Sequence, residues 1–332
     1  MDSGSLPQTY KALAAQEDGL PRRLVELPLS KPGQNQILVK MAFAPLNQTD
    51  LLCSQGFYRL SEQSPFPVGL EGSGVIVEIG EGVPETYKVG GRVHVHSRGV
   101  LAQYVLDGPD GVFPMKDELT LEEGASHLVN PSMVAHLTAL AVRGGCKAVI
   151  NTAASSALGK MLIRDLKERG IKSINTVRDD KYIEELKKEG ADYVLNSESA
   201  DFEAKLKEVV EKEGVTMAFD AINGDFTDKL IRNLPANSTV YVYGLLGGTK
   251  YGLFEEKQLE DGKSVKGLVS YSYIFEWKER GELDKFYDEV QSKLKTVYKS
   301  DIHKVCSLDE VLEAMEYYEK NSSKGKILIK PN

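Results

Sequence analysis

The stretch that decides the fold is Asn151-Thr152-Ala153-Ala154-Ser155-Ser156-Ala157-Leu158-Gly159-Lys160. An apolar run near 148–152 leads into it and an amphipathic segment follows, which predicts a buried strand, a turn and a helix. A dinucleotide-binding turn needs three small residues in the spacing G-x-G-x-x-G, for a tight turn, close phosphate approach and tight helix packing. Ala154, Ser156 and Gly159 hold those three places.

The turn supplies six candidate cofactor-binding residues: Ala154, Ser155, Ser156, Ala157, Leu158 and Gly159. Only the last position is a literal glycine, but Ala and Ser are also small, and the free amides at a helix start can bind phosphate. A helix simply capped by serine explains the same residues without a ligand.

A regular alternation of strands and helices follows the turn. The predicted strands lie near 148–152, 173–177, 193–196, 216–220 and 239–243. The predicted helices lie near 156–169, 181–189, 201–212 and 225–233. Strands that alternate with amphipathic helices predict an α/β, doubly wound parallel sheet with helices on both faces. This continuation favours the cofactor interpretation of the turn over a simple cap.

The two chain ends have a different pattern. From Thr9 to about Asp107, short apolar runs are separated by Gly and Pro, which indicates a mostly antiparallel β domain. The tail has an aromatic-rich segment, two helices and a final strand near 326–329. We expect the tail to fold back, so that 1–121 and 267–332 form one domain around a cofactor domain at 122–266.

Composition excludes several classes of protein. The 332 residues include 41 basic and 49 acidic side chains, and the charge of −8 disfavours a nucleic-acid binder. No apolar run is long enough to span a membrane, and the start carries no targeting pattern, so a cytoplasmic protein is expected. If a presequence was removed before residue 1, the mitochondrial matrix is the alternative location. Three cysteines, Cys53, Cys146 and Cys306, predict no disulfide framework.

Arg178 follows the second predicted strand, where an NAD site would place a carboxylate for the ribose 2′-hydroxyl. A guanidinium there suits a 2′-phosphate instead, which favours NADPH over NADH. Asp179 and Asp180 come next, and an exposed, solvated arginine is the alternative.

Several motifs in order resemble the medium-chain dehydrogenase/reductase superfamily, in its zinc-free quinone reductase and enoyl-thioester reductase branch. The motifs are Asn47-Gln48-Thr49-Asp50, Gly56-Phe57-Tyr58, Gly69-Leu70-Glu71-Gly72-Ser73-Gly74, Val129-Asn130-Pro131, the turn at 151–160, and Gly325-Lys326-Ile327-Leu328-Ile329. The resemblance implies a GroES-like catalytic domain, made from both chain ends, around a Rossmann domain.

The resemblance also bears on zinc. Zinc-dependent members carry a Cys near Asn47-Gln48 and a His directly before Glu71, where this chain has Leu70. Neither an amide nor leucine replaces the thiolate and imidazole that catalytic zinc prefers. His94 and His96 alternate on a predicted strand, but two ligands do not close a site, and ordinary strand histidines are favoured. We predict no metal.

By the same resemblance, Tyr58 is the candidate proton donor, and Asn47 orients the nicotinamide ribose or the substrate carbonyl. Lys326 would face the pyrophosphate. Tyr243-Gly244-Leu245 would pass beside the nicotinamide, and Ser272 is a further candidate cofactor contact in a segment that departs from the pattern of close relatives. The alternatives are that Tyr58 is an ordinary aromatic residue in a loop and that Lys326 is an ordinary surface lysine.

These observations predict a zinc-independent, NADPH-dependent reductase that transfers hydride to a quinone, an enone or a 2-enoyl thioester. Without a Lewis acid, reduction of a conjugated double bond is easier than oxidation of a plain alcohol. The alternative is a catalytically weak NADPH-binding protein with a structural or regulatory role. The expected partners are a small-molecule substrate and a second copy in a homodimer, with no nucleic acid and no membrane.

Overall fold

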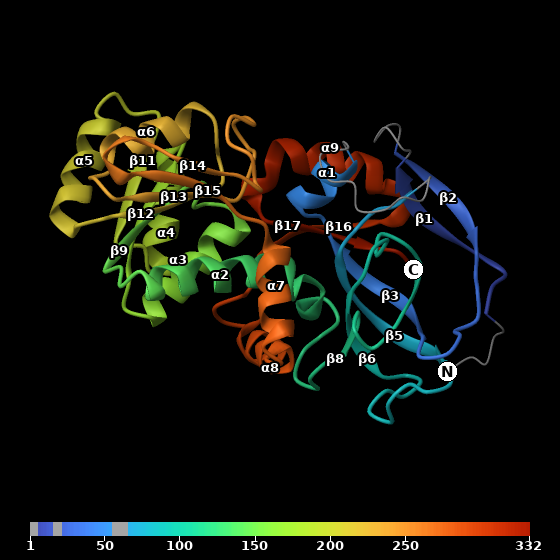
Figure 1. Ribbon diagram of the computed structural model, residues 1–332. Helices are drawn as coiled ribbons and strands as arrows, with labels where there is room; N and C mark the ends of the chain where they lie inside the picture. Colours follow the sequence, from blue (N-terminus) through green and yellow to red (C-terminus); the bar gives the residue numbers. More distant parts are fainter. Residues whose placement is uncertain (1–5, 16–21, 55–65) are drawn as a thin grey trace. The chain divides into compact units, whose positions relative to one another are not determined.

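The computed structural model describes residues 6–15, 22–54 and 66–332 (Figure 1). The chain divides into two compact units, Met1–Val129 with Asp288–Asn332, and Asn130–Tyr287. The boundaries predicted from the sequence, 121/122 and 266/267, fall before these two junctions. The first unit therefore contains both chain ends, and the second is one continuous segment.

The second unit is built on a seven-stranded sheet in the order β11-β10-β9-β12-β13-β15-β14. Its strands are β9 (Ala148–Asn151), β10 (Lys172–Val177), β11 (Tyr193–Asn196), β12 (Met217–Asp220), β13 (Thr239–Val242), β14 (Glu256–Gln258) and β15 (Ser264–Gly267). All pairs are parallel except β14 with β15. The predicted doubly wound parallel sheet is confirmed, with two additional strands at its β13 side.

Helices precede, connect and follow these strands along the chain. They are α2 (Val129–Arg143), α3 (Ala157–Glu168), α4 (Ile183–Glu189), α5 (Phe202–Glu213), α6 (Asp225–Asn233) and α7 (Ser270–Glu279), with 3-10 turns at Asp180–Tyr182 and Glu260–Gly262. α3 packs on α4 and α5 packs on α6. Because parallel crossovers are right-handed, the reversal of strand order at β9 places these two pairs on opposite faces of the sheet. The aromatic-rich segment after Gly267, which the sequence left unassigned, forms α7.

The first unit contains two sheets. One has the order β2-β1-β4, from β2 (Arg23–Pro28), β1 (Thr9–Ala15) and β4 (Phe66–Pro67). The other has the order β16-β17-β3-β5-β6-β8, and β7 also pairs with β3. Its strands are β16 (Ile302–Ser307), β17 (Lys326–Lys330), β3 (Ile37–Pro45), β5 (Glu71–Ile79), β6 (Arg92–His96), β8 (Val112–Pro114) and β7 (Tyr104–Asp107).

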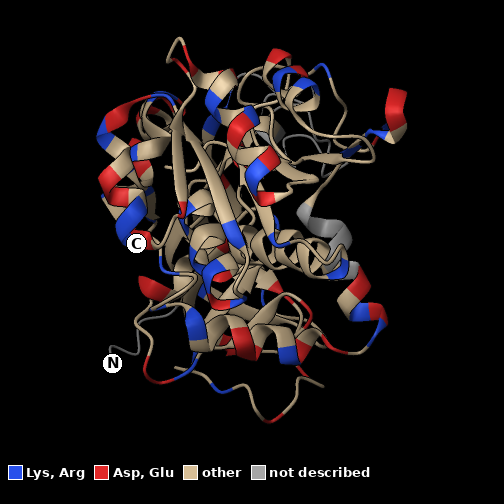
Figure 2. Cartoon of the chain, turned by 90° about the vertical axis from the view of Figure 1, so that its left-hand side faces the viewer, with Lys and Arg blue, Asp and Glu red and all other residues tan. Residues whose placement is uncertain are grey.

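The remaining helices are α1 (Gln48–Ser54), α8 (Leu283–Lys293) and α9 (Val311–Asn321), with 3-10 turns at Glu123–Ser126, Leu308–Glu310 and Ser322–Lys324. In the described part of the chain, none of the helices has the length and apolar character that a membrane crossing requires. Acidic and basic residues are interspersed along the helices (Figure 2). This mixing agrees with the small net charge of the sequence.

Two glycines allow β3 and β5 to approach closely. A Cβ at Gly72 would lie 2.7 Å from the Phe43 carbonyl oxygen, and one at Gly74 would lie 2.5 Å from the Lys40 carbonyl oxygen. Both distances are shorter than van der Waals contact, so a larger residue would push the strands apart. The pairing of β3 with β5 also has two register shifts, which bend the strands around the core.

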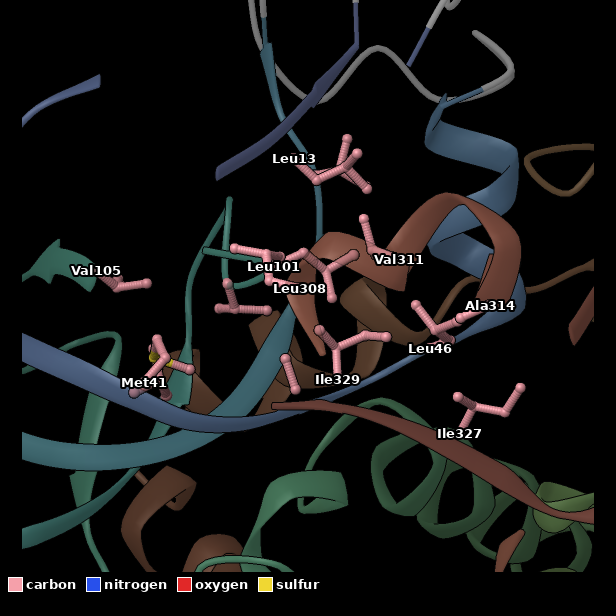
Figure 3. Packing of buried hydrophobic residues seen from close by; sticks show 14 of the residues in the cluster. Leu13, Met41, Leu46, Leu101, Val105, Leu308, Val311, Ala314, Ile327 and Ile329 are labelled. Carbon is pink, nitrogen blue, oxygen red and sulfur yellow. The ribbon is translucent and has the colours of Figure 1, made fainter. Parts of the chain in front are cut away.

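The core of the first unit takes residues from both ends of the chain (Figure 3). Leu13, Met41 and Leu46 come from the N-terminal part, and Val311 and Ile329 from the C-terminal part. β17 pairs with β3 at Leu328↔Pro45 and Ile329↔Ala44. The tail therefore joins the N-terminal β region at this strand pair.

Imidazole rings are buried beside the β5 and β6 strands. His94 is 1% exposed, its Nδ1 lies 2.8 Å from the Gly124 carbonyl oxygen, and its ring stacks on that of His127 at 4.4 Å between centroids. Because a carbonyl oxygen only accepts, Nδ1 carries the proton. Burial lowers the pKa of His94 to about 4.

This burial predicts a loss of stability in acid. The folded-state pKa of His94 lies below the ordinary value of about 6.5, so the neutral ring stabilises the fold above that pH. The contribution, on the order of 3 kcal/mol, is lost as the pH falls toward about 4. Urea unfolding across that range measures it. His94→Gln should reduce the pH dependence by that amount, and the exposed control His303→Gln should not; equal slopes in all three proteins would contradict the prediction.

Candidate functional site

The turn after β9 brings the amides of a helix start to the carboxyl edge of the sheet. Ser156 caps α3, because its Oγ accepts a hydrogen bond from the Gly159 amide at 3.0 Å. The predicted serine cap is therefore present, but it engages only one amide. The amides of Ala157 and Leu158 have no acceptor within the described residues. They are available to an anion, and the α3 dipole favours one.

Tight packing sets the position of this turn. A Cβ at Gly159 would lie 2.6 Å from the Ala154 carbonyl oxygen and 2.7 Å from the Ala154 Cα, both of which are backbone atoms. Ala154 is fully buried, and its amide donates to the Thr176 carbonyl at 3.1 Å. Ala153 has a φ of 48°, an uncommon value for a residue with a side chain. Glycine is thus required at the packing place, whereas alanine and serine fit the other two.

Arg178 lies directly after β10 and is exposed. The two acids that follow it are engaged elsewhere. Asp179 pairs with Lys181 Nζ at 2.7 Å, and this hydrogen bond lowers the pKa of Asp179, while Asp180 accepts from Asn196 Nδ2 at 2.9 Å. Among the described residues, none forms an ion pair with the Arg178 guanidinium. Its charge is open to a ligand at the same sheet edge as the turn.

A buried carboxylate that sequence reasoning missed organises this edge. Asp220, at the end of β12, is fully buried. Its Oδ1 accepts from Thr152 Oγ1 at 2.8 Å, and its Oδ2 accepts from Thr227 Oγ1 at 2.6 Å. The backbone amides of Ile222 and Asn223 donate to the same carboxylate. One sequence signal could have identified Asp220, because it is a carboxylate at the end of a predicted apolar strand.

The segment Tyr243-Gly244-Leu245 follows β13 and is attached to the loop after β12. The Tyr243 amide donates to the Asp220 carbonyl at 2.9 Å. A Cβ at Gly244 would lie 2.4 Å from the Ala221 carbonyl oxygen, so only glycine fits there. Burial and the charge of Asp220 raise the pKa of Tyr243, whose hydroxyl is buried without a partner among the described residues. Leu245 is half-buried.

In the first unit, Asn47 and Lys326 come into direct contact. Lys326 is 1% exposed, and its Nζ donates to Asn47 Oδ1 and to the Leu46 carbonyl oxygen. The alternative of a surface lysine is therefore wrong. The Asn47 Nδ2 donates to Glu71 Oε1 at 3.0 Å, and Glu71 Oε2 accepts from the amide of Leu128. Sequence reasoning gave Glu71 no role beyond a family motif.

Further polar groups surround this contact. Asp50 accepts from the Asn47 amide at 2.8 Å through Oδ2, and its Oδ1 is buried without a partner among the described residues. Burial raises the pKa of Asp50 to about 7. Burial lowers the pKa of Lys326, although the charges of Glu71 and Asp50 oppose this. Burial and the same carboxylates raise the pKa of Tyr318.

Two predicted site residues lack described side chains. Tyr58 lies in 55–65, outside the described residues, and Ser272 lies within α7 but its side chain is not described. His94 and His96 belong to β6, as the sequence predicts. Across residues 6–15, 22–54 and 66–332, no group of three or more His, Cys, Asp or Glu side chains has a metal-binding arrangement.

Comparison with known families matches both units in chain order. The alcohol dehydrogenase GroES-like domain family matches residues 33–117, and the zinc-binding dehydrogenase family matches residues 157–287. The first segment holds Asn47 and Glu71, and the second begins within the turn after β9 and includes Arg178.

Individual relatives extend over most of the chain. Prostaglandin reductase-3 of Mus musculus is 24% identical over 317 residues, which cover 92% of this chain and 83% of that protein. The mitochondrial enoyl-[acyl-carrier-protein] reductase of Xenopus tropicalis is 28% identical over 272 residues, covering 79% and 76%. A crystal structure from Mesorhizobium loti, provisionally assigned as an NADPH:quinone reductase, has a TM-score of 0.85 at 28% identity and covers 99% of this chain and 100% of its own.

The motifs, the two matched families and the full-length structural likeness agree. The chain belongs to the medium-chain dehydrogenase/reductase superfamily, in the branch that contains quinone and enoyl reductases, and it is an oxidoreductase.

Proposed function

We propose that this protein is an NADPH-dependent, zinc-independent reductase that transfers hydride to a quinone or to a carbon–carbon double bond conjugated to a carbonyl. The observation that carries the proposal lies at one sheet edge, where the amides of Ala157 and Leu158 have no acceptor, and the Arg178 guanidinium no ion-pair partner, among the described residues. Amides at a helix start suit a pyrophosphate, and a guanidinium suits a 2′-phosphate.

The residues of the second unit fit this cofactor. Ala154 to Gly159 would hold the pyrophosphate, since a Cβ at Gly159 would displace the turn. Arg178 would hold the 2′-phosphate, and Tyr243-Gly244-Leu245 and Ser272 would line the nicotinamide. Bound NADPH would supply the hydride. Lys326 is retained as a candidate cofactor contact, although its ammonium already has two acceptors.

The remaining roles belong to chain residues that act on the substrate. Asn47 would hydrogen-bond the substrate carbonyl, and Tyr58 would supply the proton that completes the reduction. We further propose a homodimer, in which the polar edge strand β14 is a candidate pairing edge, and a cytoplasmic or mitochondrial matrix location.

The cofactor preference is tested at Arg178. Arg178→Ala removes the charge-assisted hydrogen bonds to a 2′-phosphate, so the Kd for NADPH should rise by roughly 10- to 100-fold while that for NADH changes little. Fluorescence titration with both nucleotides measures this. Lys172→Ala is the matched control, because it removes one exposed cation at the opposite end of β10. Equal binding of both nucleotides by the unchanged protein would contradict the preference.

The reaction is tested by following NADPH oxidation with a benzoquinone, an enone and crotonyl-coenzyme A as acceptors. We expect turnover of at least one, and a fall in kcat of roughly 100-fold or more in Tyr58→Phe, which loses the proton donor. NADPH binding without turnover of any acceptor would favour the structural or regulatory alternative. Unchanged kcat in Tyr58→Phe would remove that residue from the mechanism.

The metal prediction has its own measurement. Leu70 is buried and offers no ligand atom, and the Asn47 amide is already hydrogen-bonded on both sides. Elemental analysis of the purified protein should therefore give zinc far below one atom per chain, and a chelator should leave activity and unfolding midpoint unchanged. Stoichiometric zinc would contradict the zinc-independent mechanism.

A further inference from the structure

The Asn47 side-chain amide lies between groups of opposite charge. Its Nδ2 donates to Glu71 Oε1 at 3.0 Å, and its Oδ1 accepts from Lys326 Nζ. A flipped amide would set its oxygen against the carboxylate and its NH₂ group against the ammonium. Both contacts would then be repulsive, so the two neighbours allow one orientation only.

Glu71 is itself held at both oxygens. Its Oε2 accepts from the backbone amides of Leu128 at 2.8 Å and Val129 at 3.0 Å, and Oε1 accepts from Asn47. The side chain is 1% exposed. Backbone donors cannot move without moving the chain, so the carboxylate presents a fixed acceptor to Asn47.

Lys326 is fixed on the other side of the amide. β17 pairs with β16 on one edge and with β3 on the other, so the strand that carries Lys326 is internal to its sheet. The Nζ also donates to the Leu46 carbonyl oxygen at 3.4 Å, one residue before Asn47. The ammonium and the amide it contacts are thus both held by neighbouring backbone.

The hydrogen-bonding capacity left to Asn47 follows from these contacts. The amide nitrogen has two N–H groups, and Glu71 accepts one of them. The amide oxygen faces a buried cation. The second N–H has no acceptor among the described residues. It is therefore the group that remains for a ligand, and it only donates.

We propose that Glu71 and Lys326 are positioning residues that fix the Asn47 amide, and that Asn47 thereby acts in the reaction as a hydrogen-bond donor to the substrate carbonyl oxygen. This inference rests on the proposed function. When hydride adds to the β-carbon of a conjugated substrate, the π electron pair of the double bond shifts and negative charge collects on that oxygen. An oriented N–H stabilises this charge.

A swap of two side chains tests the donor. In Asn47→Asp combined with Glu71→Gln, the new glutamine amide donates to the new carboxylate, the contact with Lys326 is kept, and the spare N–H disappears. We expect an unfolding midpoint and a Kd for NADPH close to those of the unchanged protein, with kcat reduced roughly 100- to 1,000-fold and KM changed much less. Asn47→Asp alone is the control, because two carboxylates then face each other and the midpoint should fall.

A swap variant that folds, binds NADPH and keeps the kcat of the unchanged protein would overturn the donor role. The positioning pair has a second test that needs no turnover. Glu71→Gln and Lys326→Met should each lower the urea midpoint. In the double variant, the midpoint should fall by less than the sum of the two single decreases. Strictly additive decreases would overturn the positioning role of Glu71 and Lys326. This result is independent of the proposed function, which is contradicted separately if no acceptor is reduced.

Discussion

The contact between Gly159 and the backbone of Ala154 is the constraint on which the second unit depends. It presses the first turn of α3 against the turn after β9, with no room for a single additional carbon atom. Because β9 is the strand at which the order of the sheet reverses, this contact sets where the helix amides lie relative to the ends of β10 and β12. Arg178 and Asp220 then reach the same edge simply because parallel strands end together.

The first unit buries several ionisable side chains away from water. Burial of Asp50, Glu71 and Lys326 costs free energy that an apolar core would not cost. Each of the three has hydrogen bonds within the unit, but one oxygen of Asp50 has none among the described residues. Ionisable side chains retained at such a cost are typical of sites that do chemistry rather than of cores that only pack.

The sequence predicted β9 to β13 and α3 to α6 because each one carries its own periodic pattern of apolar residues. It did not predict β15, and it left the segment of α7 unassigned. It missed β14, whose Glu-Lys-Gln residues are all exposed and leave no apolar pattern to read. The contact of Lys326 with Asn47 joins positions 279 residues apart, so no local pattern encodes it. Lysine is also seldom buried, which is why a surface position was a reasonable alternative. The family motif drew attention to both residues, but only the fold brings them together.

The place of β17 has a consequence for the order in which the protein is made. β3 leaves the ribosome early, but its neighbour on one side is β17, the last strand of the chain. The Leu46 carbonyl oxygen therefore has to wait until 280 further residues are made before Lys326 can donate to it. At about 5–20 residues per second, that wait is on the order of tens of seconds. The second unit, which is continuous in sequence, emerges complete during this interval. A nascent chain would therefore carry a folded second unit while the edge of β3 that later pairs with β17 is still unpaired. At this stage, that strand edge is where the protein most needs protection from aggregation.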